Sequence, residues 1–117
     1  MSEKCIVRRL QDVPPVPCPC GSSTRLITRA DTETANLHVT HIRDSRKHYH
    51  TACTEYYYIL DGEGRMELDE ETVELRPGTA ILIPPGVAHR GWGDFRALIV
   101  GVPAWEHTDE FFQEDDA

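Results

Sequence analysis

The chain has 117 residues, a length that accommodates one domain, and 20 acidic residues against 12 basic ones give it a formal net charge of -8. This negative charge repels nucleic-acid phosphates and anionic membrane surfaces, so we expect neither nucleic acid nor membrane as a partner. No apolar run approaches the ~20 residues that span a bilayer, and Met1 to Cys5 lack the basic and apolar segments of a secretory signal. We therefore expect a cytoplasmic protein.

Proline dominates the N-terminal segment. Four prolines fall within residues 13–19 and remove backbone donors, which excludes a helix or a central strand there. The sequence predicts an extended arm over residues 1–22, running as polyproline II or as a strap across another surface.

Four cysteines, at positions 5, 18, 20 and 53, could form two disulfides, hold a structural zinc ion or remain free. The pair Cys18 and Cys20 is closer than the two-residue gap of most zinc knuckles, and no second pair follows it. Because the chain also shows no secretory signal, the sequence favours free thiols.

After the arm, short β-branched or apolar runs alternate with turns rich in Gly, Pro and Asp. The expected strands are residues 24–29, 36–43, 55–60, 65–68, 72–75, 79–83, 87–92 and 95–102, and turns at 61–64 and 93–94 are among those that separate them. Strands at this spacing predict an all-β sandwich or barrel over residues 23–103. The tail, residues 104–117, carries Trp105, Phe111 and Phe112 among acids. We expect it to form a short helical turn or to pack its aromatic rings on the barrel or a partner.

Alternation along two strands assigns side chains to faces. In residues 36–43, His38 and His41 lie on opposite faces, so one of them must face the barrel interior. His41 is a candidate for a catalytic or substrate-contacting group. If Glu55 faces inward, Tyr57 follows it, which makes Tyr57 a second catalytic candidate, although a core role with a partnered hydroxyl is the simpler reading.

The pair His48 and His50 suits a transition metal. Residues two apart on a strand face the same side, so both imidazoles offer a ring nitrogen to one point. A turn at residues 51–54 would let Glu55 face the same cavity and complete the 2-His-1-carboxylate pattern of non-haem iron sites. Spacing alone does not bring in the distant His89, which enters a strand after a rigid Pro-Gly turn.

These residues resemble the two motifs of the cupin superfamily. The first motif, His-x-His followed by Glu and Gly, is matched by His48, His50, Glu55 and Gly62. The second, Gly followed by Pro-x-Gly and His, is matched by Gly78, Pro84, Gly86 and His89. The resemblance covers about residues 37–102 and implies an all-β, cupin-type jelly-roll β-barrel. It also implies that one metal ion is bound by His48, His50, Glu55 and His89.

The resemblance further implies one divalent transition metal, which these ligands accept as Fe, Mn, Zn, Ni or Co. We expect a metal-dependent enzyme acting on a small anionic or oxygen-rich molecule, in a dioxygenase-like or sugar-isomerase-like reaction such as that of mannose-6-phosphate isomerase. The alternative is a non-catalytic barrel that binds a small ligand or metal, because no second acid–base group beside the metal is evident. A sensor role ranks last, since nothing encodes a DNA-binding helix pair.

Two further expectations concern ligands and partners. Arg25, Arg65 and Arg96 are candidates for holding an anionic substrate, with a solvated strand position as the simpler reading of each. Resemblance to cupins that pair or exchange an N-terminal strand implies a homodimer.

Overall fold

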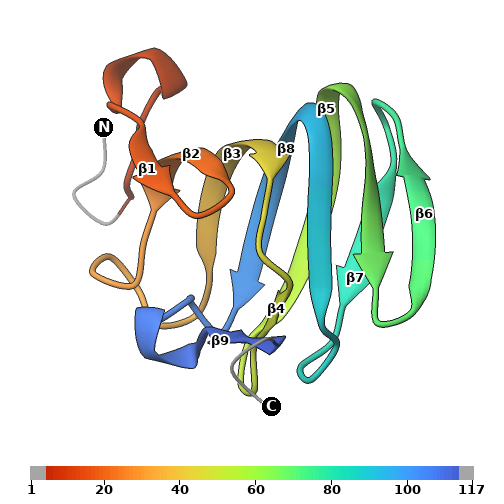
Figure 1. Cartoon of the computed structure of the whole chain (residues 1–117). Helices are drawn as coiled ribbons and strands as arrows, with labels where there is room; N and C mark the ends of the chain where they lie inside the picture. The colour runs from red at the N-terminus through yellow and green to blue at the C-terminus, as the bar shows by residue number, and fades with distance from the viewer. Residues whose placement is uncertain (1–4, 114–117) are drawn as a thin grey trace.

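Two long antiparallel strands, β5 (Thr54–Leu68) and β8 (His89–Val102), form a central ribbon around which the other strands are arranged (Figure 1). The computed structural model describes residues 5–113, and within this range the chain forms one nine-stranded sheet, two 3-10 helices and no α-helix. The described residues thus contain no helix of the length and apolar character that crossing a membrane requires. The predicted all-β architecture is confirmed.

The central ribbon bends at its glycine-rich middle. A Cβ atom at Gly64 would lie 2.5 Å from the carbonyl oxygen of Trp92, so only glycine permits the strands to approach so closely there. The pairing of β5 with β8 also shifts register just before Asp61, as at a β-bulge. The turns predicted at residues 61–64 and 93–94 are therefore wrong. Both segments are bends inside continuous strands, because they pair with each other instead of reversing the chain.

The remaining strands extend the ribbon on both sides. β6 (Glu71–Leu75) and β7 (Ala80–Ile83) pair with different halves of β5. β3 (Asn36–Asp44) pairs with β8, and β2 (Gly21–Ile27) pairs with β3. The short strand β4 (His48–Tyr49) pairs with the start of β8. The strands predicted at β2, β3, β6 and β7 are confirmed, with bounds that differ by a few residues at their ends, whereas β4 was not among the predicted strands.

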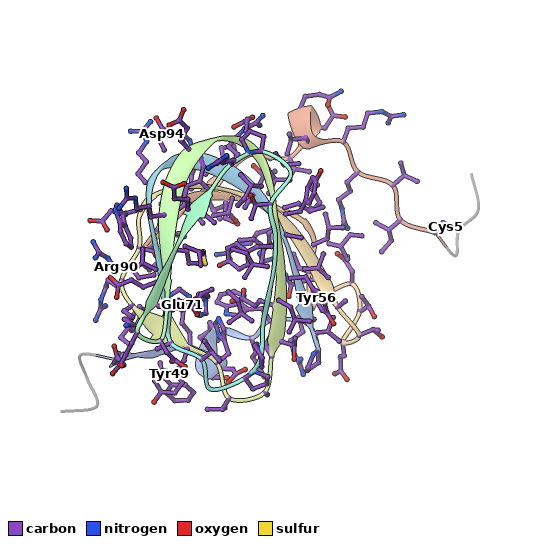
Figure 2. All side chains as sticks on the ribbon, turned by 90° about the vertical axis from the view of Figure 1, so that its right-hand side faces the viewer. Cys5, Tyr49, Tyr56, Glu71, Arg90 and Asp94 are labelled. Carbon is purple, nitrogen blue, oxygen red and sulfur yellow. A yellow bond between two sulfur atoms is a disulfide. The ribbon has the colours of Figure 1, made fainter. Side chains whose placement is uncertain are left out.

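Curling of the sheet encloses a core of inward side chains (Figure 2). The buried cluster consists of Ile42, Tyr57, Ile59, Met66, Leu75, Ile83, Phe95, Ala97 and Ile99. Glu55 and Tyr57 are buried together, whereas Tyr56 and Tyr58 are exposed, as the predicted alternation requires. One face of β5 therefore lines the interior and the other lies outside.

The N-terminal arm contains η1 (Leu10–Asp12) and the edge strand β1 (Val16–Cys18), which pairs with β2. Cys18 and Cys20 form a disulfide with Cα atoms 5.3 Å apart, and the other two cysteines are free. The prediction of free thiols is thus wrong for this pair, because the tight turn between β1 and β2 brings both sulfurs within bonding reach. Disulfides are rare in cytosolic proteins, so this disulfide does not support the predicted cytoplasmic location, which stays a prediction.

The C-terminal tail folds back onto β4. It contains η2 (His107–Asp109) and β9 (Phe111–Phe112), and β9 pairs with β4. The rings of Phe111 and Tyr49 stack with centroids 5.5 Å apart. The carboxylate of Asp109 accepts hydrogen bonds from the backbone N–H groups of residues 51–53. The tail therefore combines the expected short helical turn with aromatic packing on the barrel.

Candidate metal centre

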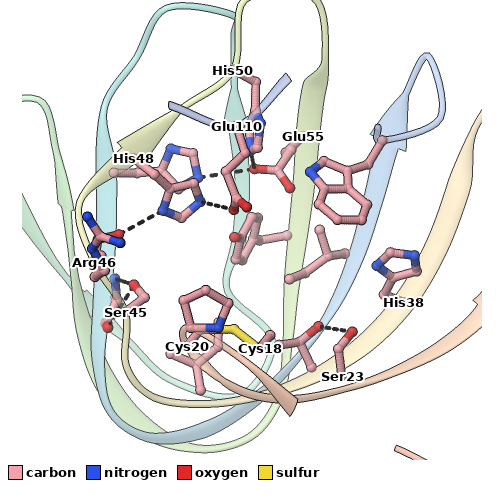
Figure 3. Close-up of a pocket in the computed structure, with 18 of the residues that line it drawn as sticks. Cys18, Cys20, Ser23, His38, Ser45, Arg46, His48, His50, Glu55 and Glu110 are labelled. Carbon is pink, nitrogen blue, oxygen red and sulfur yellow. Dashed lines mark hydrogen bonds and ion pairs between the residues drawn. A yellow bond between two sulfur atoms is a disulfide. The ribbon is translucent and has the colours of Figure 1, made fainter. Parts of the chain in front are cut away.

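The four residues of the cupin motifs that imply metal binding meet at one point inside the curled sheet (Figure 3). His48 on β4 lies directly opposite His89, the first residue of β8, and His50 follows β4 immediately. Glu55 lies at the other end of the ribbon, opposite Gly101. A flat ribbon would hold its two ends far apart, so the bend in β5 and β8 is what brings Glu55 to His89.

The ligand atoms are close together. Oε1 of Glu55 lies 3.1 Å from Nε2 of His50 and 3.1 Å from Nε2 of His89. The ring centroids of His48 and His89 are 4.2 Å apart. One donor atom from each of the four residues lies within 4.8 Å of the others. A single ion can therefore contact all four after small side-chain movements.

Backbone carbonyls orient all three imidazoles. Nδ1 of His48 donates to the carbonyl oxygen of Arg46 at 2.8 Å. Nδ1 of His50 donates to the carbonyl oxygen of Asp109 at 2.5 Å. Nδ1 of His89 donates to the carbonyl oxygen of Val87 at 3.0 Å. A carbonyl oxygen only accepts hydrogen bonds, so each Nδ1 carries a hydrogen. In the neutral ring, Nε2 then presents its lone pair toward the centre.

With the imidazoles neutral, the buried atoms that face the centre lack hydrogen-bond partners. These atoms are Nε2 of His50, Nε2 of His89 and Oε1 of Glu55. Unsatisfied buried polar atoms are costly, and lone pairs that converge on one point repel unless a cation lies between them. Imidazole nitrogens with a carboxylate oxygen are a donor set for divalent transition metals. The residues present therefore fit the metal ion that the cupin motifs imply.

Charges within the cluster are strongly coupled. Burial lowers the pKa of His50, but the neighbouring Glu55 outweighs burial and raises the pKa to about 9. Burial raises the pKa of Glu55, but its contacts with His50 and His89 leave that pKa far below its ordinary value. Burial, with the nearby His89, lowers the pKa of His48 to about 4. Without metal, the site at pH 7 thus holds an imidazolium–carboxylate pair beside a neutral imidazole.

The cluster lines an internal cavity of about 150 Å³. Tyr57, one of the catalytic candidates, also lines this cavity and is buried. Burial, with the charge of Glu55, raises the pKa of the Tyr57 hydroxyl well above its ordinary value, so this group stays protonated at pH 7. Arg25 and His38 line a further part of the same cavity, on β2 and β3.

His41, the other catalytic candidate, does not line the cavity. Its Nε2 lies 2.5 Å from the carboxylate of Asp94 on the outer face, and His38 takes the inward position on the same strand. Arg65 and Arg96, two of the arginines considered for substrate binding, do not line the cavity either. Strand alternation separated the two histidines correctly but could not tell which face is inside.

Glu110 is a cavity residue that sequence reasoning missed. Its Oε1 lies 3.9 Å from Nε2 of His48, and its side chain is only 23% exposed. Burial raises the pKa of Glu110, against the opposing influence of His50. The acidic and aromatic character of the tail indicated packing on the barrel, but no spacing links residue 110 to the histidine motif.

The chain belongs to the cupin family, because the cupin domain family matches residues 38–97, about half of the sequence. Among curated relatives, the uncharacterized protein MJ1618 of Methanocaldococcus jannaschii is 38% identical over 66 residues, which cover 53% of each chain. The matched segments span 53% of the length of this relative and 41% of the length of another curated relative, the Streptomyces halstedii protein SchB. The resemblance to cupins in the sequence is thus confirmed.

Solved structures confirm the cupin fold. A protein from Planctomyces limnophilus superposes with a TM-score of 0.85 at 31% identity, covering 91% of this chain and 95% of that one. The Streptomyces nucleoside dehydratase Pac13 superposes with a TM-score of 0.78 at 17% identity, covering 92% of this chain and 93% of its own. At 17% identity, the likeness to Pac13 shows the fold alone.

Proposed function

We propose that this protein is a metal-dependent cupin enzyme acting on a small, oxygen-rich or anionic molecule. The observation that carries the proposal is the convergence of three oriented imidazoles and one carboxylate on a buried point beside a cavity. In this proposal, His48, His50, Glu55 and His89 bind one divalent transition metal. A cavity of about 150 Å³ suits a compact molecule better than a polymer.

A bound divalent metal would supply Lewis acidity, or oxygen activation if the metal is iron. Four protein ligands leave about two positions of an octahedral ion open to substrate oxygen atoms or dioxygen. Dioxygenase-like and sugar-isomerase-like reactions both fit such a site. The small-molecule chemistry of the Streptomyces nucleoside dehydratase, which has the same fold, supports a small substrate.

The test begins with the metal content of protein purified without chelators or nickel resin, measured by mass spectrometry. We expect close to one transition metal ion per chain. His50→Ala and His89→Ala should each lose most of it while the circular dichroism spectrum is retained, because neither imidazole belongs to the apolar cluster that forms the core. His41→Ala is the matched control, since this histidine lies outside the cavity. Full metal content in both ligand variants would show that the assignment is wrong.

The identity of the metal directs the activity screen. Bound iron calls for oxygen-uptake assays, and bound zinc or manganese calls for anaerobic isomerase and lyase assays on sugar phosphates and small acids. Metal retained without turnover in either screen would favour the alternative, a barrel that binds a small ligand without transforming it.

We also propose that the protein forms a homodimer through the outer face of β5, β7 and β8. Exposed apolar and aromatic side chains there are Tyr56, Tyr58, Leu60, Leu82 and Val102, each at least 39% exposed. With about 4.8 Å between strands and about 7 Å between outward positions on one strand, these five residues cover roughly 170 Å² of the sheet. These five side chains carry no charge in a chain of net charge -8, so a second copy can dock on them without charge repulsion.

Sedimentation equilibrium tests the dimer. We expect about twice the chain mass of 13.3 kDa at micromolar concentration, and the chain mass for Leu82→Glu. Leu10→Glu is the matched control, because Leu10 is exposed on the N-terminal arm. A monomeric Leu10→Glu with a dimeric Leu82→Glu would instead assign the contact to the arm.

A further inference from the structure

Arg25 and His38 form a polar pair on the cavity wall. They are direct partners across the β2–β3 ladder, so their side chains leave the sheet on the same face. Both line the cavity, and His38 is only 8% exposed. Nε of Arg25 and Nε2 of His38 are buried and have no hydrogen-bond partner. Two unsatisfied nitrogens on one wall indicate a place for a ligand that brings oxygen atoms.

Arg25 lacks a carboxylate partner within residues 5–113. Arginines elsewhere in that range do form ion pairs, for example Arg8 with Asp31 and Arg96 with Asp61. The Arg25 guanidinium instead lies over the ring of Trp105, 5.1 Å from its centroid. Its charge opposes the burial that raises the pKa of Glu110 in the same cavity, but the two side chains form no salt bridge.

Trp105 holds this pair in place. Its ring meets the ring of His38 edge-on, with centroids 6.3 Å apart. Its backbone N–H donates to Oδ1 of Asn36 at 2.6 Å, which anchors the tail beside β3. The guanidinium of Arg25 is thus packed on one side by an aromatic ring, in a residue that lines the cavity.

The distance to the candidate metal centre follows from strand register. His38 on β3 pairs with Ile99 on β8, which pairs with Tyr57 on β5, and Glu55 lies two residues further along β5. With about 4.8 Å per strand spacing and about 3.4 Å per residue, His38 and Glu55 are separated by roughly 12 Å between Cα atoms. A molecule of a few carbon atoms can bridge side chains that project from these positions into one cavity.

We propose that Arg25, with Nε2 of His38, binds a carboxylate of the substrate, whose other end presents oxygen atoms to the metal. This proposal rests on the proposed function and narrows its substrate class to small carboxylic acids. The planar fork of Arg25 matches a carboxylate with two parallel hydrogen bonds. Burial, with the charge of Arg25, lowers the pKa of His38 to about 4, so His38 contributes a hydrogen bond without a second charge.

The charges of the cavity wall agree with an anionic ligand. Arg25 and Arg46 oppose Glu55 and Glu110 among the cavity residues, so the formal charges of these four side chains cancel. A divalent metal would bring the sum to about +2, which an anionic ligand offsets. A neutral sugar would leave this surplus of about +2 without a counter-charge in the cavity.

Trp105 fluorescence provides a local test in a Trp92→Phe background, because the chain has two tryptophans. The zinc-loaded protein is titrated with succinate, which has a carboxylate at each end, and with inorganic phosphate. Arg25→Met removes the charge and keeps the aliphatic length. Arg65→Met is the matched control, an exposed arginine outside the cavity. Zinc content is measured for every variant.

We expect succinate to change the emission of Trp105, and Arg25→Met to raise the dissociation constant for succinate about tenfold to a hundredfold at unchanged zinc content. Arg65→Met should leave it unchanged. Equal succinate affinity in Arg25→Met and its parent would overturn the proposal, as would tighter binding of phosphate than of succinate. If zinc does not bind, the proposed function fails and the titration is repeated on metal-free protein. If succinate then changes the Trp105 emission and Arg25→Met weakens that response, the carboxylate site is supported. If succinate gives no response that depends on Arg25, the carboxylate site is overturned.

Discussion

Metal binding at the cluster should release a proton from His50. The pKa of this imidazole is raised to about 9 because Glu55 outweighs the effect of burial, so Nε2 of His50 carries a proton at pH 7 in the metal-free protein. A metal ion requires the lone pair of that nitrogen, and proton and metal therefore compete. Protonation is complete well below the pKa and lost above it, so metal affinity should rise with pH up to about 9 and then level off.

The size of the effect follows from the two pH units between 7 and 9. Well below the pKa each unit weakens binding tenfold, and at pH 9 half of the imidazole is still protonated, so the apparent dissociation constant should fall about 50-fold from pH 7 to pH 9, or ~2.3 kcal/mol. Glu55→Gln removes the charge that raises the pKa of His50 while burial remains. We expect the pH dependence above 7 to vanish in this variant. Its amide oxygen keeps one weaker ligand, so Glu55→Gln should bind less tightly than the parent at pH 9, with a smaller difference at pH 7.

Competition with a chromophoric zinc chelator at pH 7, 8 and 9 measures these affinities. Calorimetry in two buffers of different ionisation enthalpy counts the released protons, and we expect about one per zinc ion at pH 7. His89→Ala is the control, because it removes an imidazole but keeps the pair of His50 and Glu55. This variant should bind zinc weakly at every pH, and its zinc affinity should still rise between pH 7 and pH 9. A flat parent profile between pH 7 and 9, or an unchanged slope in Glu55→Gln, would refute this reasoning.

Two further predictions concern the parts of the fold that position the cluster. Gly64→Ala places a methyl group 2.5 Å from the carbonyl oxygen of Trp92, and we expect urea unfolding to show a loss of about 1–3 kcal/mol. Asp109→Ala removes the carboxylate that accepts hydrogen bonds from the N–H groups of residues 51–53. Those bonds fix the backbone of residue 109, whose carbonyl oxygen orients His50, so zinc affinity should fall about tenfold or more. Glu106→Ala is the control for the latter, and equal zinc affinity in both variants would show that Asp109 does not position the site.

Local spacing in the sequence predicted that His48 and His50 lie together, because a His-x-His pair on a strand puts both rings on one side, whereas His89 entered only through the resemblance to the cupin motifs. It could not predict the continuous path of β5 and β8. Gly and Asp next to each other suit a turn, and only the pairing of residues 61–64 with 93–96 shows that they form a bend instead. The same limit applies to His38 and His41. Alternation is a local property, whereas the choice of the inner face depends on how the whole sheet curls.

Residues outside the family match complete the cavity. The match covers residues 38–97, which contain the four residues proposed to bind the metal. Arg25 comes from β2 and Trp105 and Glu110 from the tail, and all three line the cavity beside that cluster. The four proposed ligands come from the two ends of the β5–β8 ribbon and from β4 with the residue after it, all within the matched region. What the bound ion acts on depends on the walls, and part of these walls comes from the segments before and after the matched region. Variants in those segments, more than variants of the ligands, should therefore separate substrate recognition from metal binding.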